Sequence, residues 1–136
     1  MSAPNWLGLT GISFAIFIAI DLFWLGIVAR PLYRHFMGDI LLDHPRWAPS
    51  LLFYALWVVG LVYFAVGPVI TDGDAWTLAL RHGALYGFFT YATFDLTCRA
   101  VLKGYPLGIV PIDMAWGTIL AGATASLATV LWRVIT

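Results

Sequence analysis

The sequence predicts an all-α integral membrane protein, folded as one domain in a four-helix bundle. Hydrophobic residues make up 62% of the 136 residues and charged residues 10%, whereas a soluble domain has roughly 45–50% apolar and about 25% charged residues. The apolar residues also occur in long continuous runs, and a helix needs about 20 such residues to cross the hydrocarbon core of a bilayer. A protein surface this apolar is expected to face lipid.

Four segments are long enough for such helices. They cover residues 6–29, 49–70, 75–102 and 107–135. The first is expected to end at Arg30-Pro31, and Asp74 is expected to cap the third. Membrane β-strands are the alternative, but they alternate polar and apolar residues over about 10 residues. The runs here are unbroken and about twice as long, so we expect helices.

The basic residues predict an orientation in the membrane. Five of the seven belong to one side: Arg30, Arg34 and Arg46 lie in the loop after the first helix, and Arg99 and Lys103 flank the loop after the third. The opposite side carries Arg81 and Arg133. Because short cytoplasmic loops are rich in Lys and Arg, we expect both termini to be periplasmic in the inner membrane of a bacterium.

Small residues at four-residue spacing occur on the last two predicted helices. The third carries Gly83 and Gly87, and the fourth carries Gly117, Ala121 and Ala125. Ridges of small residues let two helix backbones approach closely in a membrane. We therefore expect the third and fourth helices to pack tightly together.

Three aspartates within the predicted spans are the main functional feature of the sequence: Asp21, Asp95 and Asp113. A carboxyl group in the hydrocarbon costs at least a few kcal/mol, so it usually has a function or a partner. At 1.5 Å per residue, each lies roughly 9–12 Å from the cytoplasmic end of its helix. We therefore expect the three carboxyls to converge, and like-charge repulsion should keep at least one protonated at neutral pH.

Two of these aspartates share a local pattern. Trp24 follows Asp21, and Trp116 follows Asp113, at a spacing of three residues that places each pair on one helical face. An indole N–H is a hydrogen-bond donor, and here it could reach a carboxyl oxygen on its own or a neighbouring helix.

The third aspartate, Asp95, has different neighbours on its own helix. Tyr91 precedes Asp95 by four residues and Arg99 follows it by four. An Asp–Arg pair at this spacing can neutralise itself near the membrane surface. Lys103 comes one turn later and could meet an anionic lipid headgroup.

Several functions remain open at this point. The polar residues could be a buried network that fixes helix register, or a site that binds a lipid headgroup or small amphiphile, or relays protons. The candidate site residues are Asp21, Asp95, Asp113, Trp24, Trp116, Tyr91, Arg99 and Lys103. A membrane enzyme of lipid metabolism, with a carboxyl as acid or base, is one alternative. A structural accessory subunit of a larger membrane complex is another, and a homo-oligomer is also possible.

Other partners have little support in the sequence. The single cysteine, Cys98, rules out a multi-cysteine metal cluster and an internal disulfide, and no cofactor motif is present. With a formal net charge of zero, the chain lacks the basic surface that nucleic-acid binding requires. We expect membrane lipids and a lipid-like or small-molecule ligand as partners, and no metal or cofactor.

An ordered set of motifs gives the chain a family resemblance. They include Ile20-Asp21-Leu22-Phe23-Trp24-Leu25-Gly26, Tyr91-Ala92-Thr93-Phe94-Asp95-Leu96-Thr97, Leu102-Lys103-Gly104-Tyr105-Pro106 and Asp113-Met114-Ala115-Trp116-Gly117-Thr118. Together they resemble a bacterial family of four-span membrane proteins, the domain-of-unknown-function family twenty-one seventy-seven. The resemblance implies an inner-membrane protein of four helices and no particular activity. The chain departs from the family pattern at Phe94 and Cys98, where the family often has Tyr and Asn.

Overall fold

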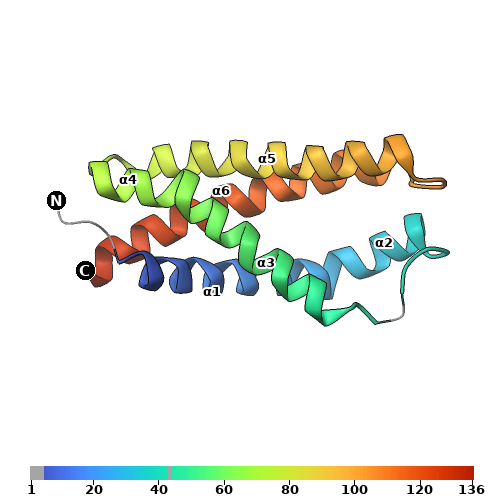
Figure 1. Cartoon of the computed structure of the whole chain (residues 1–136), viewed down its shortest axis with the longest axis horizontal. Coiled ribbons are helices and arrows are strands. Elements are labelled where there is room, and N and C mark those ends of the chain that lie inside the picture. The colour runs from blue at the N-terminus through green and yellow to red at the C-terminus, as the bar shows by residue number, and fades with distance from the viewer. Residues whose placement is uncertain (1–4, 43) are drawn as a thin grey trace.

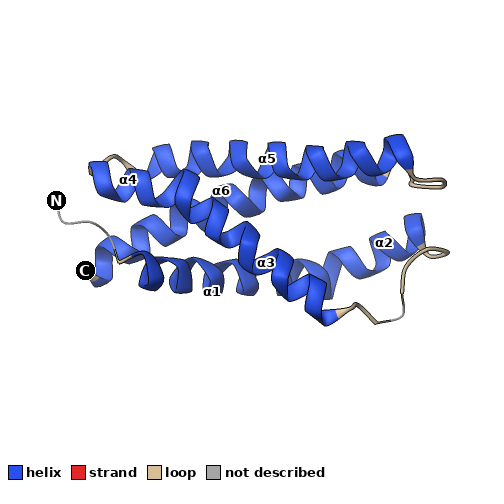
Figure 2. Cartoon of the chain, in the orientation of Figure 1, coloured by secondary structure: helices blue, strands red, loops and turns tan. Residues whose placement is uncertain are grey.

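The fold is entirely helical in the part of the chain that the computed structural model describes, residues 5–42 and 44–136, and no strand occurs there (Figures 1 and 2). The elements are α1 (Trp6–Trp24), η1 (a π-helix, Leu25–Ala29), α2 (Arg30–Met37), α3 (Trp47–Leu61), η2 (a π-helix, Val62–Val66), α4 (Gly67–Asp72), α5 (Trp76–Val101) and α6 (Ile109–Ile135). This confirms the predicted all-α class.

The first helix is longer than predicted because it passes through a proline. The helical stretch α1–η1–α2 continues to Met37, so the predicted end at Arg30-Pro31 is wrong. Pro31 lies in the first turn of α2, directly after η1, and Pro68 lies in the first turn of α4, directly after η2. Proline lacks the N–H of an α-helical bond and clashes with the preceding turn. The wider π turn changes the local bonding register, which lets both helices continue.

Helices α5 and α6 lie close to the predicted bounds of the third and fourth helices, but the cap predicted at Asp74 does not form. Helix α5 begins at Trp76 after Ala75, which makes no side-chain capping bond. The N–H of Asp74 instead donates to the carbonyl of Val69 at 3.0 Å, next to Gly73 at φ 71°. This geometry ends α4 in a left-handed residue that satisfies its last carbonyls.

Among the described residues, three helical stretches are long and apolar enough to cross a membrane: Trp6–Met37, Trp47–Asp72 and Ile109–Ile135. Helix α5 has 26 residues, about 39 Å at 1.5 Å per residue, but Arg81, His82, Asp95 and Arg99 lower its hydropathy. Three apolar spans thus support a membrane protein, and a fourth crossing by α5 stays a prediction.

The tightest packing joins α5 and α6, which run side by side in opposite directions (Figure 1). A Cβ added at Gly83 would lie 2.6 Å from the Cβ of Ala125, and one added at Gly87 would lie 2.6 Å from the Cβ of Ala121. The Cβ added at Gly87 would lie closer still to the carbonyl oxygen of Gly117. This confirms the predicted close contact, which side chains larger than hydrogen would prevent.

The remaining helices complete the bundle around α6. Helix α1 packs against α6, α3 packs against α1, and η2 packs against α5. Their core is apolar and includes Leu9, Phe17, Val58, Leu61 and Leu120. Many large apolar side chains instead point outward, such as Phe23 at 66% exposure and Leu7 at 86%. A water-soluble protein would bury these side chains, whereas lipid solvates them.

The two ends of the bundle carry different elements. The start of α1 and the end of α6 lie at one end of the bundle, and α2 and the α5–α6 turn lie at the other (Figure 1). In this turn Gly104 has φ 76°, a conformation that glycine adopts at low cost. The turn folds Tyr105 back against the bundle, where it is 4% exposed.

Candidate functional site

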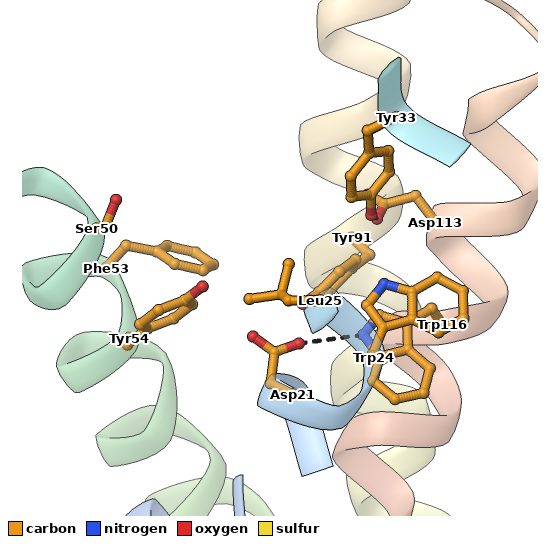
Figure 3. Close-up of a pocket in the computed structure, with 10 residues that line it drawn as sticks. All are labelled: Asp21, Trp24, Leu25, Tyr33, Ser50, Phe53, Tyr54, Tyr91, Asp113 and Trp116. Atoms are coloured by element: carbon orange, nitrogen blue, oxygen red, sulfur yellow. Dashed lines mark hydrogen bonds between the residues drawn. The ribbon is translucent and has the colours of Figure 1, made fainter. Parts of the chain in front are cut away.

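A cavity of about 220 Å³ opens where six helical elements meet (Figure 3). Its lining comes from α1 (Asp21, Trp24), η1 (Leu25), α2 (Tyr33), α3 (Ser50, Phe53, Tyr54), α5 (Tyr91) and α6 (Asp113, Trp116). We call it the polar cavity. In Figure 3 the three α3 side chains form one wall and face the side chains of α1 and α6 across the opening.

Asp21 lies on the α1 side of this cavity and is 7% exposed. Its Oδ1 accepts a hydrogen bond of 3.4 Å from Nε1 of Trp116 on α6. The hydroxyl of Tyr54 is also near this carboxyl. The indole that binds Asp21 therefore comes from a neighbouring helix and not from Trp24 on its own helix.

Asp113 lies opposite on α6 and is 8% exposed. Its Oδ1 accepts a hydrogen bond of 2.6 Å from the hydroxyl of Tyr33, a short distance typical of a bond to a carboxylate. Tyr33 belongs to α2, beyond the predicted end of the first helix. The continuation of the helix through Pro31 is what brings this phenol to the cavity.

Two tryptophans form one edge of the cavity. The rings of Trp24 and Trp116 stack with centroids 4.3 Å apart and planes 8° apart. Nε1 of Trp24 is buried without a hydrogen-bond partner among the described residues, although the Tyr33 hydroxyl is nearby. The two similar Asp–Trp motifs thus differ. Both indoles stack on each other, but Trp116 donates to a carboxyl and Trp24 does not.

Asp95 is fully buried and has a partner that the sequence did not suggest. Its Oδ1 accepts a hydrogen bond of 2.7 Å from the hydroxyl of Tyr105. Arg99, the expected partner of Asp95, donates from Nη1 to the backbone carbonyl of Tyr105 at 2.8 Å. The expected Asp95–Arg99 pair is therefore replaced by two separate bonds to Tyr105, and Oδ2 of Asp95 has no hydrogen-bond partner in the described part of the chain.

The eight predicted candidates thus divide into two groups. Five line the polar cavity: Asp21, Trp24, Tyr91, Asp113 and Trp116. Asp95 is a near neighbour of Asp113 but does not line the cavity. Arg99 and Lys103 are exposed near the α5–α6 turn. Within residues 5–42 and 44–136, no three His, Cys, Asp or Glu side chains are grouped to hold a metal ion.

A second cavity of about 260 Å³ adjoins the first. It is lined by Phe53, Trp57, Thr90, Tyr91, Phe94 and Asp113, and we call it the apolar cavity. Nε1 of Trp57 donates to Oγ1 of Thr90 at 3.1 Å, so two of the polar groups in its wall already bind each other. Phe53, Tyr91 and Asp113 line both cavities. The two spaces therefore meet at one carboxyl and two aromatic rings.

Sequence reasoning missed part of the polar cavity. The missed residues are Leu25, Tyr33, Ser50, Phe53 and Tyr54. The depth count made for the aspartates would have found Tyr54, because it lies five residues inside the predicted second helix, at a depth of about 8 Å. Tyr33 offered no such signal, since it appeared to lie in a loop.

A comparison with known proteins agrees with this architecture at the level of family. The family model "Predicted membrane protein (DUF2177)" matches residues 7–130, which include every residue that lines the two cavities. No curated protein and no solved structure matches the chain. The protein therefore belongs to DUF2177, a family of predicted membrane proteins.

Proposed function

We propose that the protein binds an amphiphile within the membrane, with the polar headgroup in the polar cavity and the apolar chain in the apolar cavity. One observation carries the proposal: the two cavities share Phe53, Tyr91 and Asp113. A ligand with one polar end and one apolar end matches this pair of spaces. Ligand sites in proteins commonly combine apolar and aromatic walls with a few polar groups.

The size and chemistry of the polar cavity support a headgroup as its occupant. Its volume of about 220 Å³ is below the roughly 300–1,000 Å³ of sites for drug-sized ligands. The walls of the apolar cavity include Phe94, which is 59% exposed, and Phe53, which is 49% exposed. A ligand chain could therefore reach the cavity from the surrounding lipid.

Filling the polar cavity tests this proposal. We expect Ser50→Trp to keep the helical fold and to lose most of the lipid-like molecules that co-purify with the wild-type protein in mild detergent, measured by mass spectrometry. Ser50 lines the cavity, and its own hydrogen bond goes to the carbonyl of Arg46 in the preceding turn. Ala55→Trp is the control, because Ala55 is exposed on the same helix. Equal lipid retention by both variants would refute amphiphile binding in this cavity.

Proton relay is a second candidate function. A chain of hydroxyl and carboxyl groups supports it: Tyr33 binds Asp113, Asp113 neighbours Asp95, and Asp95 binds Tyr105 in the α5–α6 turn. The chain leads from the polar cavity toward one end of the bundle. Proton flux into liposomes that contain the protein distinguishes relay from binding alone.

We also propose that the chain crosses a bacterial inner membrane four times, with both termini in the periplasm. Five of seven basic residues belong to the two connections expected in the cytoplasm. A reporter active only in the cytoplasm should therefore be silent after Thr136 and active after Ile40. Strong signal after Thr136 would reverse the orientation and place the aspartates in the other leaflet.

A further inference from the structure

We infer that the polar cavity selects an ammonium group, so that the amphiphile carries a primary or quaternary amine at its polar end. This inference rests on the proposed function and specifies the chemistry of the headgroup. It depends on the charge of the cavity, on its aromatic walls and on the capacity of its two carboxyls to accept hydrogen bonds.

The charged side chains of the cavity are both acidic. Asp21 and Asp113 line it, and no Lys, Arg or His is among the described residues that line either cavity. Both carboxyls are more than nine-tenths buried. A carboxyl in such surroundings is either protonated or paired with a positive charge, and a cationic ligand would supply the charge that lets these two ionise.

Each of these carboxyls accepts one hydrogen bond at Oδ1. Trp116 donates to Oδ1 of Asp21, and Tyr33 donates to Oδ1 of Asp113. The hydroxyl of Tyr54 is also near Asp21, and the carboxyl of Asp95 is near Asp113. A carboxylate has about four acceptor sites. Both side chains can therefore still accept from a ligand that brings positive charge or N–H donors.

The aromatic walls favour the same ligand. Six aromatic side chains line the cavity: Trp24, Tyr33, Phe53, Tyr54, Tyr91 and Trp116. The face of an aromatic ring is electronegative and attracts cations, most strongly for Trp, and aromatic cages are a common means of binding quaternary ammonium groups. The cavity combines such rings with two carboxyls.

Other headgroups match the cavity less well. A phosphate or carboxylate would face two acidic side chains and no basic one among the described residues of the wall. A sugar would require donors and acceptors on all of its sides, whereas most of the wall consists of aromatic rings and Ser50 already donates to a backbone carbonyl. An ammonium group needs acceptors and aromatic faces, which the cavity supplies.

The test compares two molecules of the same shape and different charge. The full-length protein in mild non-ionic detergent is titrated with choline and with its neutral carbon isostere, in which a tert-butyl group replaces trimethylammonium. We expect choline to bind at least about tenfold more tightly, since a buried cation–π contact is worth about 2 kcal/mol and 1.4 kcal/mol is tenfold. A third titration, with dodecyltrimethylammonium, adds an apolar chain to the same cation.

Variants assign the selectivity to the cavity. Asp21→Asn and Asp113→Asn keep the acceptor oxygen for Trp116 and Tyr33, and each should weaken choline binding about tenfold without changing the affinity of the isostere. Asp72→Asn is the control, because Asp72 is exposed at the end of α4. If an Asn variant does not fold, the comparison of choline with its isostere on the wild-type protein still decides the question.

The outcomes separate this inference from the proposed function. Equal affinity for choline and the isostere would refute an ammonium headgroup. Amphiphile binding would still be supported in that case if Ser50→Trp lost its lipid and the control Ala55→Trp did not. Preference for choline supports the inference, and the third titration then identifies the source. Much tighter binding of dodecyltrimethylammonium would indicate a lipid, and similar binding would indicate a free amine.

Discussion

Replacing Gly87 with leucine is expected to lower the thermal unfolding temperature of the protein in mild detergent. Even a Cβ at this position would clash with the carbonyl of Gly117 and lie 2.6 Å from the Cβ of Ala121. These are a backbone group and a short side chain, so neither can rotate away. Overpacking costs about 1–3 kcal/mol in well-packed cores, and leucine adds three carbons beyond the Cβ.

The control for this substitution is Gly11→Leu. Gly11 is exposed on α1, and a Cβ added there would meet no neighbouring side chain or helix within 4 Å, so leucine should be tolerated in lipid or detergent. An unchanged unfolding temperature for Gly87→Leu would show that α5 and α6 can separate without loss of stability. The close contact of these helices would then not hold the bundle together.

Tyr105→Phe is expected to destabilise the protein by about 1–3 kcal/mol, the cost of leaving a buried polar group unsatisfied. The phenol is the hydrogen-bond donor to Asp95, which is fully buried and whose other oxygen has no partner among the described residues. Without the hydroxyl, the whole carboxyl lacks a hydrogen bond. Thermal unfolding in detergent measures the loss. Tyr63→Phe is the control, since Tyr63 is 64% exposed, and equal stability of the two variants would contradict a structural role for the Tyr105–Asp95 bond.

The buried phenol of Tyr105 also gives the stability a pH dependence in alkaline solution. Burial, followed by the hydrogen bond to Asp95 and the charge of Asp95, raises the pKa of Tyr105 above its ordinary value of 10.0. Unfolding therefore allows the phenol to lose its proton more easily. The contribution of Tyr105 is complete below pH 10.0 and declines as the pH rises toward the folded pKa. Tyr105→Phe should remove this part of the alkaline decline.

The sequence predicted the helices better than their contacts. The apolar runs predicted a helix over 75–102, and the structure has one over Trp76–Val101. The spacing of Gly83 and Gly87 also predicted the α5–α6 contact correctly. Both predictions depend on properties of a single helix, namely its length and the residues along one face, which a sequence displays directly.

Contacts between elements were harder to predict. Spacing of four residues suggested that Arg99 would pair with Asp95, but the turn at Gly104 brings Tyr105 between them. A helix that ended at Pro31 would leave Tyr33 in a loop, whereas the helix continues and Tyr33 donates to Asp113. In both cases a backbone feature changes the contacts that residue spacing and proline predict. The feature is a left-handed glycine in the first case and a π turn in the second, and residue types alone do not reveal either.

The π turn at η1 gives the site some tolerance to a change in chain length. A π turn holds about one residue more than an α turn, and each residue of an α-helix rotates the side chains that follow by roughly 100°. Loss of one residue between Leu25 and Ala29 would close the π turn to an α turn and leave Tyr33 on about the same helical face. The same loss within α1 would instead turn Tyr33 away from Asp113. In evolutionary terms, a single deletion should be selected against less strongly in η1 than in the regular helix before it.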